Sequence, residues 1–299
     1  MGMGGSRENL GGSMTESNQG MLYVVATPIG NLDDLSPRAR HTLAEVGLIA
    51  AEDTRHTSML LSHFGIHTPL ISLHDYNEAQ KTPRLVEKLL TGISLALVSD
   101  AGTPLISDPG FNLVRAAWAA GVRVIPIPGT CALIAALSVS GLPTDRFVFE
   151  GFLPAKTAAR KKRLADLATD PRTLVFYESI HRLKESLNDM AQILGGERLS
   201  VIARELTKLH EDVRAGMLAE LVNQIESNSF AIKGEVVLMV AGAMSTQITE
   251  TSLDVDHVLK VLLTAMPVKQ AAALAAKITG LSKNQLYQRA LGISGNKLV

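Results

Sequence analysis

The sequence predicts two α/β domains in a row, followed by a small module made only of helices. Short apolar runs alternate with amphipathic helical patterns, which is typical of open sheets with helices on their faces. The pattern changes near Pro143, so a second unit of about equal size follows the first. A polar stretch at residues 243–253 then separates this unit from a helical C-terminal part.

The first domain is expected over residues 21–141, with a mostly parallel sheet. Ser36 stands where a helix N-cap is expected and Pro37 at the first helical position, an arrangement that both residues favour. Asp53 and Thr54 open a further helix, which Gly65 closes. Strands are expected at residues 21–26, 48–51, 95–98 and 122–127, and helices from Pro37 and at 53–64, 83–90, 111–120 and 130–140.

The second domain is expected over residues 142–242. Its strands are predicted at 147–152, 173–177, 199–203 and 235–240, and its helices at 156–168, 181–194 and 216–225. Residues 243–253 are expected to be a linker, and residues 1–20, rich in Gly, Ser and Asn, a disordered tail. In the module at 254–299 an Ala-rich helix ends at Gly280 and Ser282 caps the next, which is typical of a helix-turn-helix.

Composition excludes several classes of protein. Hydrophobic residues make up 46% and charged residues 19%, as in globular proteins, and no apolar run approaches the ~20 residues that a membrane span needs. The N-terminus has no signal-peptide pattern, and the single cysteine, Cys131, fits a reducing cytoplasm. No Cys/His cluster has metal-ligand spacing, so no metal is expected. Glycine motifs for NAD, FAD and P-loop nucleotides are also missing from the sequence.

Positive charge is concentrated in two places although the formal net charge is zero. No acidic residue follows Asp256, whereas six basic residues do, among them Lys283 and Arg289. A second cluster lies in the middle of the chain. Such patches favour contact with nucleic-acid phosphates, and a solvated helix face is the alternative. The central cluster consists of Lys156, Arg160, Lys161, Lys162 and Arg163.

The carboxyl ends of the predicted strands are the expected place for a ligand. The strand at 95–98 breaks into a small polar loop, in which Gly102 permits close approach to the backbone and Asp100 adds a negative charge. An ordinary turn capped by Asp100 is the alternative. Similar loops from both domains are expected to form the walls of a cleft. They lie at 27–35, 99–104, 128–132, 177–182 and 203–211.

Four strings in these loops resemble, in order, the ribosomal RNA small subunit methyltransferase I family of the tetrapyrrole methylase superfamily. They are residues 25–35 (VATPIGNLDDL), 98–110 (VSDAGTPLISDPG), 176–182 (FYESIHR) and 203–211 (ARELTKLHE). The resemblance implies a tetrapyrrole methylase fold with S-adenosylmethionine in the cleft between two α/β domains. It also implies methyl transfer to the ribose 2′-hydroxyl of a cytidine in 16S rRNA, by a cytoplasmic homodimer that binds the small ribosomal subunit.

The same resemblance implies a set of cofactor-binding residues. They are Thr27, Pro28, Gly30, Asp100, Ala101, Gly102, Thr103, Thr130, Cys131, Tyr177, Ala203 and Gly234. Methyl transfer depends mainly on positioning, and a base or a cation helps to deprotonate a weakly acidic ribose hydroxyl. The candidates are Lys208 as the cation and Glu178 or Glu205 as the base. The alternative is that Glu205 and Lys208 form an ordinary ion pair at the surface.

Arg55 and Arg182 are expected to hold phosphates, together with the central basic cluster, Lys283 and Arg289. Two other functions remain open. One is methylation of a tetrapyrrole or another small molecule, which needs no basic patch. The other is a nucleic-acid-binding protein without enzymatic activity, which needs no large two-domain body.

Overall fold

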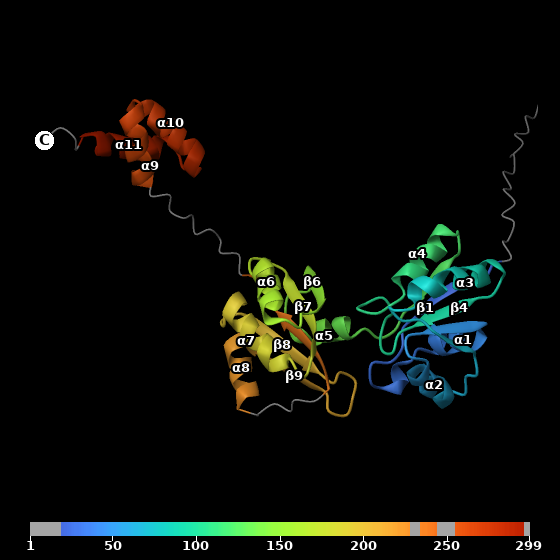
Figure 1. Cartoon of the computed structure of the whole chain (residues 1–299). Coiled ribbons are helices and arrows are strands. Elements are labelled where there is room, and N and C mark those ends of the chain that lie inside the picture. The colour runs from blue at the N-terminus through green and yellow to red at the C-terminus, as the bar shows by residue number, and fades with distance from the viewer. Residues whose placement is uncertain (1–18, 228–233, 244–254, 296–299) are drawn as a thin grey trace, which may run out of the picture. The chain divides into compact units, whose positions relative to one another are not determined.

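The computed structural model describes residues 19–227, 234–243 and 255–295 (Figure 1). The chain forms two compact units, residues 1–242 and 243–299. Most of the expected tail at residues 1–20 and of the expected linker at 243–253 lies outside the described residues. Gly20, placed at the end of the expected tail, is buried, and its backbone N–H donates a hydrogen bond of 2.8 Å to the carbonyl of Leu89.

The first half of the larger unit contains a sheet of five parallel strands. Its strand order is β3-β2-β4-β1-β5, as expected for a mostly parallel sheet. All four residues of β4 are buried, because helices cover both faces of the sheet. Successive residues of β4 pack into different clusters, Leu95 and Leu97 into one and Ala96 and Val98 into the other. The strands are β1 (Leu22–Val25), β2 (Leu48–Ala51), β3 (Leu70–Ser72), β4 (Leu95–Val98) and β5 (Val124–Ile127).

The helices of this half begin largely where their capping residues predict. The Ser36 hydroxyl accepts a hydrogen bond from the N–H of Ala39, and the Asp53 carboxylate accepts one from the N–H of Arg55. Pro83 was expected to start a helix but lies inside one, where the carbonyl of Ala79 loses its usual backbone partner. The elements are η1 (Leu32–Asp34), α1 (Pro37–Glu45), α2 (Thr54–His63), α3 (Glu78–Leu90), α4 (Phe111–Ala119) and α5 (Ala132–Ser140).

The second half of the larger unit contains a mixed sheet of order β6-β7-β10-β8-β9. Only β6 and β7 pair in parallel; the other three pairs are antiparallel. The edge strand β9 was not predicted, and the expected helix at 216–225 begins two residues later. The elements are β6 (Phe147–Phe152), α6 (Thr157–Leu167), β7 (Thr173–Ser179), α7 (Leu183–Leu194), β8 (Leu199–Arg204), β9 (Asp212–Met217), α8 (Leu218–Glu226) and β10 (Glu235–Val240).

The C-terminal unit consists of three described helices, α9 (Val255–Ala265), α10 (Val268–Thr279) and α11 (Lys283–Gly295). Gly280 ends α10 in the left-handed conformation that favours glycine, with a φ of 71°. The helices share a small core of Leu259, Ala272, Ala275, Leu286 and Ala290. Among the helices that the structure describes, none has the length and apolarity required to span a membrane.

Candidate active site

Three loops at the carboxyl edge of the first sheet are locked together by hydrogen bonds. The N–H of Thr27, after β1, donates to the carbonyl of Gly102, after β4, and the N–H of Gly102 donates back at 3.0 Å. The Thr103 hydroxyl donates to the Thr130 carbonyl at 2.8 Å, and the Thr130 hydroxyl donates to the Thr27 carbonyl. Gly102 has a φ of +84°, a conformation that few other residues adopt without strain. The loops therefore form a rigid floor.

A cavity of about 490 Å³ lies against this floor. Its size suits a small-molecule ligand. The second half of the unit contributes a wall, in which the Tyr177 hydroxyl accepts a hydrogen bond of 3.2 Å from the N–H of Leu133 on α5. Tyr177 therefore offers its ring to the cavity while its hydroxyl holds α5. Of the sequence-predicted cofactor residues, the cavity is lined by Asp100, Ala101, Gly102, Thr103, Cys131, Tyr177, Ala203 and Gly234.

The carboxylates of Glu52, Asp100 and Asp108 line this cavity, and of these three the sequence indicated only Asp100. Burial, reinforced by the charges of Glu52, Asp100 and Asp75, raises the pKa of Asp108 to about 6 despite a hydrogen bond with Ser99. Burial also raises the pKa of Glu52. Asp108 lies in a loop eight residues beyond Asp100, so the rule that sites follow strand ends did not select it. This wall is suited to a cationic ligand.

A second cavity of about 610 Å³ adjoins the first. Ile29, Asp100, Ala101 and Glu235 line both cavities. Thr27, Pro28 and Gly30, predicted as cofactor residues, line the second cavity rather than the first. The other lining residues are Leu32, His56, Met59, Leu60, His63 and Lys208. Thr130 lines neither cavity and acts through the loop hydrogen bonds.

Lys208 lies in the second cavity between two carboxylates. Its Nζ is 2.9 Å from Glu205 Oε1 and 3.0 Å from Glu235 Oε2. Burial would lower the pKa of Lys208, but the bonds to both carboxylates outweigh it, so this pKa is raised. Burial would raise the pKa of Glu205, but Lys208 and the N–H of Glu235 outweigh it, so this pKa is lowered. The raised pKa keeps Lys208 a cation, and Glu205 is its ion-pair partner; the expected role of Glu205 as a base stays a prediction.

The loop that carries Lys208 is fastened to the first half of the unit. Glu205 and Thr207 have positive φ values of 50° and 66°, which turn the chain back on itself. The Thr207 hydroxyl accepts a hydrogen bond of 3.1 Å from the N–H of Asn31. A Cβ added to Gly30 would lie 2.3 Å from Cγ of Lys208. Only a glycine lets these two loops approach so closely.

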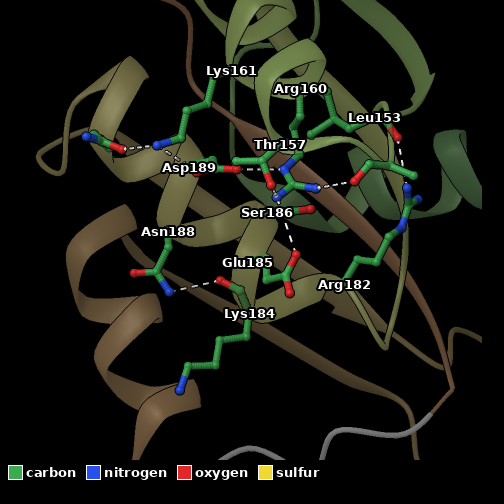
Figure 2. A network of polar contacts seen from close by, with 12 residues as sticks. Leu153, Thr157, Arg160, Lys161, Arg182, Lys184, Glu185, Ser186, Asn188 and Asp189 are labelled. Atoms are coloured by element: carbon green, nitrogen blue, oxygen red, sulfur yellow. Dashed lines mark hydrogen bonds and ion pairs between the residues drawn. The ribbon is translucent and has the colours of Figure 1, made fainter.

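Glu178, the other expected base, belongs to a buried network instead. Its side chain is fully buried, its Oε1 lies 2.7 Å from Arg182 Nη2, and its Oε2 accepts a hydrogen bond from the Ser186 hydroxyl. Arg182 also donates a hydrogen bond of 3.0 Å to the carbonyl of Leu153 (Figure 2). Both charges are thus paired inside the protein, although Glu178 also lines the first cavity and the Arg182 side chain is 24% exposed. The expected roles of Glu178 in catalysis and of Arg182 in phosphate binding stay predictions.

The structure corrects the prediction for Arg160. Its side chain is 1% exposed, and its Nε lies 2.7 Å from Asp189 Oδ2 (Figure 2). The reason is helical periodicity, because Arg160 shares the buried face of α6 with Leu164 and Leu167. It therefore cannot contact RNA.

The other basic candidates remain at the surface, some of them in ion pairs. Lys156, Lys162 and Lys283 are exposed. The other four form ion pairs with carboxylates: Arg55 with Asp53 at 2.6 Å, Lys161 with Asp189 at 3.4 Å, Arg163 with Glu150 at 2.7 Å and Arg289 with Asp256 at 2.7 Å. Within the described parts of the chain, no group of His, Cys, Asp and Glu side chains could hold a metal ion.

Comparisons with known proteins agree with this architecture. Residues 21–222 match the family of Tetrapyrrole (Corrin/Porphyrin) Methylases, and residues 249–294 match a model described as the RsmI C-terminal HTH domain. Among solved structures, the methyltransferase CobJ has a TM-score of 0.56 at 20% identity, covering 75% of this chain and 95% of that one. Diphthine synthase has a TM-score of 0.56 at 15% identity, covering 74% and 90%. At these identities the structures show the fold alone.

The chain therefore belongs to the tetrapyrrole methylase family, and it is an S-adenosylmethionine-dependent methyltransferase. A protein of Pseudomonas aeruginosa named ribosomal RNA small subunit methyltransferase I is 57% identical over 277 residues, which is 92% of this chain and 98% of that protein. One of the same name from Escherichia coli O157:H7 is 51% identical, over 94% and 98%. Within the larger family the chain is a member of the ribosomal RNA small subunit methyltransferase I group.

Proposed function

We propose that the chain transfers a methyl group from S-adenosylmethionine to the ribose 2′-oxygen of a cytidine in 16S rRNA. The observation that carries this proposal is the pair of adjoining cavities, with the Lys208 ammonium in the second and Asp100 on the wall of both. The relatives of the same name act on ribosomal RNA of the small subunit, which supports the substrate.

The residues of the first cavity fit this cofactor. S-adenosylmethionine carries a sulfonium and an ammonium group, and the carboxylates of Asp100, Asp108 and Glu52 lie on the cavity wall. Gly102 and Gly234, with φ values of +84° and +96°, also line this cavity, in conformations that favour glycine. When bound there, S-adenosylmethionine supplies an electrophilic methyl group.

Lys208 and Glu235 are the side chains that we assign to the reaction. A protonated Lys208 stabilises negative charge that develops on the attacking 2′-oxygen, and a preorganised cation is most effective in a site that excludes water. Glu235 lines both cavities and its side chain is 73% exposed, so its carboxylate is accessible to an incoming hydroxyl and can accept the proton. Glu205 holds the ammonium of Lys208 in place.

The exposed basic residues are proposed to hold RNA phosphates. Lys156 precedes α6 as its N-cap, Lys162 lies within α6, and Lys283 is the first residue of α11 in the C-terminal unit. We further propose that the C-terminal helices bind RNA, that the two α/β halves act as separate domains, and that the enzyme works in the cytoplasm as a homodimer. Large exposed apolar side chains on α4, Phe111 at 60% and Trp118 at 66%, support an association of this kind.

Methyl transfer from labelled S-adenosylmethionine tests this function. The acceptors are 30S subunits, naked 16S rRNA and uroporphyrinogen, compared in parallel with product mapping. The proposal predicts label on a cytidine 2′-oxygen of 16S rRNA, and Lys208→Met should lower kcat about 100-fold with unchanged affinity for S-adenosylhomocysteine. Label on a base, or on the macrocycle alone, would overturn it.

A further inference from the structure

One face of helix α2 lines the second cavity although it packs against no core. His56, Met59, Leu60 and His63 follow each other at helical spacing, so they form a single stripe. A neighbouring face of the helix buries Thr57 and Leu61. Met59 is 65% exposed, an unusual position for a large apolar side chain beside a catalytic cation.

The other residues that line this cavity form a second wall, which contains the proposed reactive groups. Pro28 and Gly30 lie there with Lys208 and Glu235, and the cavity opens toward the first cavity at Asp100. A group bound between the stripe and this wall would therefore lie next to both the proposed methyl donor and the ammonium of Lys208. The cavity volume of about 610 Å³ is ample for one nucleotide.

We propose that this second cavity, the α2 chamber, receives the acceptor nucleotide turned out of the RNA, with its base packed on Met59 and the two histidines. The inference rests on the proposed function and deepens it. Enzymes that modify a nucleotide extrude it when the reacting atom is out of reach, and they pack the base between aromatic or apolar side chains. Thioether sulfur also packs well against aromatic rings.

Arg55 supports this orientation of the RNA. It lies on α2 next to His56, and its side chain is 89% exposed although it is paired with Asp53. A phosphate that flanks the extruded nucleotide would meet this guanidinium at the rim of the chamber. The stripe would thus hold the base while the rim holds the backbone.

The test is steady-state kinetics with 30S subunits for the variants Met59→Ala and Met59→Leu. Truncation of an aromatic side chain that stacks on a base weakens binding about 5- to 150-fold, and since a thioether offers less surface we expect about a 5- to 50-fold loss in kcat/KM here. Met59→Ala should lose activity by this factor, mainly through KM. Met59→Leu should recover most of it, because leucine restores the apolar surface.

Two control variants separate the chamber from general effects. Ser62→Ala changes an exposed residue of α2 that does not line the cavity, and Met217→Ala removes an exposed methionine in the other half of the unit. Both should match the wild type. The affinity for S-adenosylhomocysteine, measured by calorimetry, should stay within twofold for every variant.

The outcomes distinguish this inference from the proposed function. If the wild type methylates a 16S rRNA ribose and Met59→Ala retains full kcat/KM, the α2 chamber is refuted while the function stands. An equal loss in Ser62→Ala and Met59→Ala also refutes it, because helix α2 would then matter as a whole. If the wild type labels no ribose 2′-oxygen, the proposed function itself fails.

Discussion

Replacing Arg160 by methionine should destabilise the larger unit without weakening its contact with RNA. The guanidinium is buried between α6 and α7, where it bonds to Asp189 and donates to the carbonyl of Ala155 and the hydroxyl of Thr157 (Figure 2). Methionine fills much of the same volume but provides no donor. The Asp189 side chain, 10% exposed, would then lose its main partner.

Breaking a buried ion pair from one side costs about 3–5 kcal/mol, because the remaining charge stays buried. Lys161 Nζ is 3.4 Å from the other Asp189 oxygen, so part of the charge remains compensated. We therefore expect a loss of about 3 kcal/mol in the free energy of unfolding. For a unit of this size that corresponds to a fall of roughly 6–12 °C in the melting temperature.

Urea denaturation followed by circular dichroism measures this loss. The double variant Arg160→Met with Asp189→Leu should recover most of it, since no unpaired charge remains. As the matched control, Lys162→Met on the exposed face should keep its stability and reduce the salt dependence of binding to 30S subunits. The reasoning is refuted if Arg160→Met unfolds like the wild type and binds 30S subunits less tightly.

Three further changes test the cavity walls. Asp100→Ala should weaken S-adenosylhomocysteine binding about tenfold in calorimetry, since it removes a charged acceptor; unchanged affinity would contradict its assignment. In the cofactor-free protein, the raised pKa of Asp108 means that the folded state holds a proton that the unfolded state releases. The free energy of unfolding therefore falls as the pH rises from about 4 to about 6. Asp108→Asn should have a higher free energy of unfolding than the wild type at pH 7 but not at pH 4, as measured by urea denaturation. Gly234→Ala would place a Cβ 2.1 Å from Glu205 Oε1, so kcat should fall at least tenfold as Lys208 is displaced, and an unaltered kcat would count against that role.

The elements that the sequence predicted well are those defined by local signals. Asp53 caps α2 and Ser36 caps α1. Such a cap requires only a hydrogen bond between a side chain and a backbone N–H two or three residues further on, so it can be recognised in the local sequence. The strand-end rule likewise found the Asp100 loop. β9 escaped because none of its residues is buried and it pairs only with β8 at the edge of the sheet, so its sequence lacks the apolar run of a core strand.

The environment of the site residues depends on contacts distant in sequence. Arg160 was chosen by residue type, yet it lies against α7 and pairs with Asp189, and Glu178 contacts the same helix at Ser186. Glu235 was missed because its proximity to Lys208 results from pairing between β10 and β8, a contact between residues 27 positions apart. Which charges face solvent depends on such distant contacts, and the local pattern does not contain them.

The Lys208 loop packs closely on the turn at Gly30, so the proposed catalytic cation is positioned by both halves of the unit. Its position depends on the first half of the unit through Asn31 as well as on its own half through Glu205. A misplacement of about 1 Å can cost two orders of magnitude in rate. A substitution at the turn of Gly30 and Asn31, distant in sequence from Lys208, is therefore expected to impair catalysis as strongly as a change in the lysine's own loop.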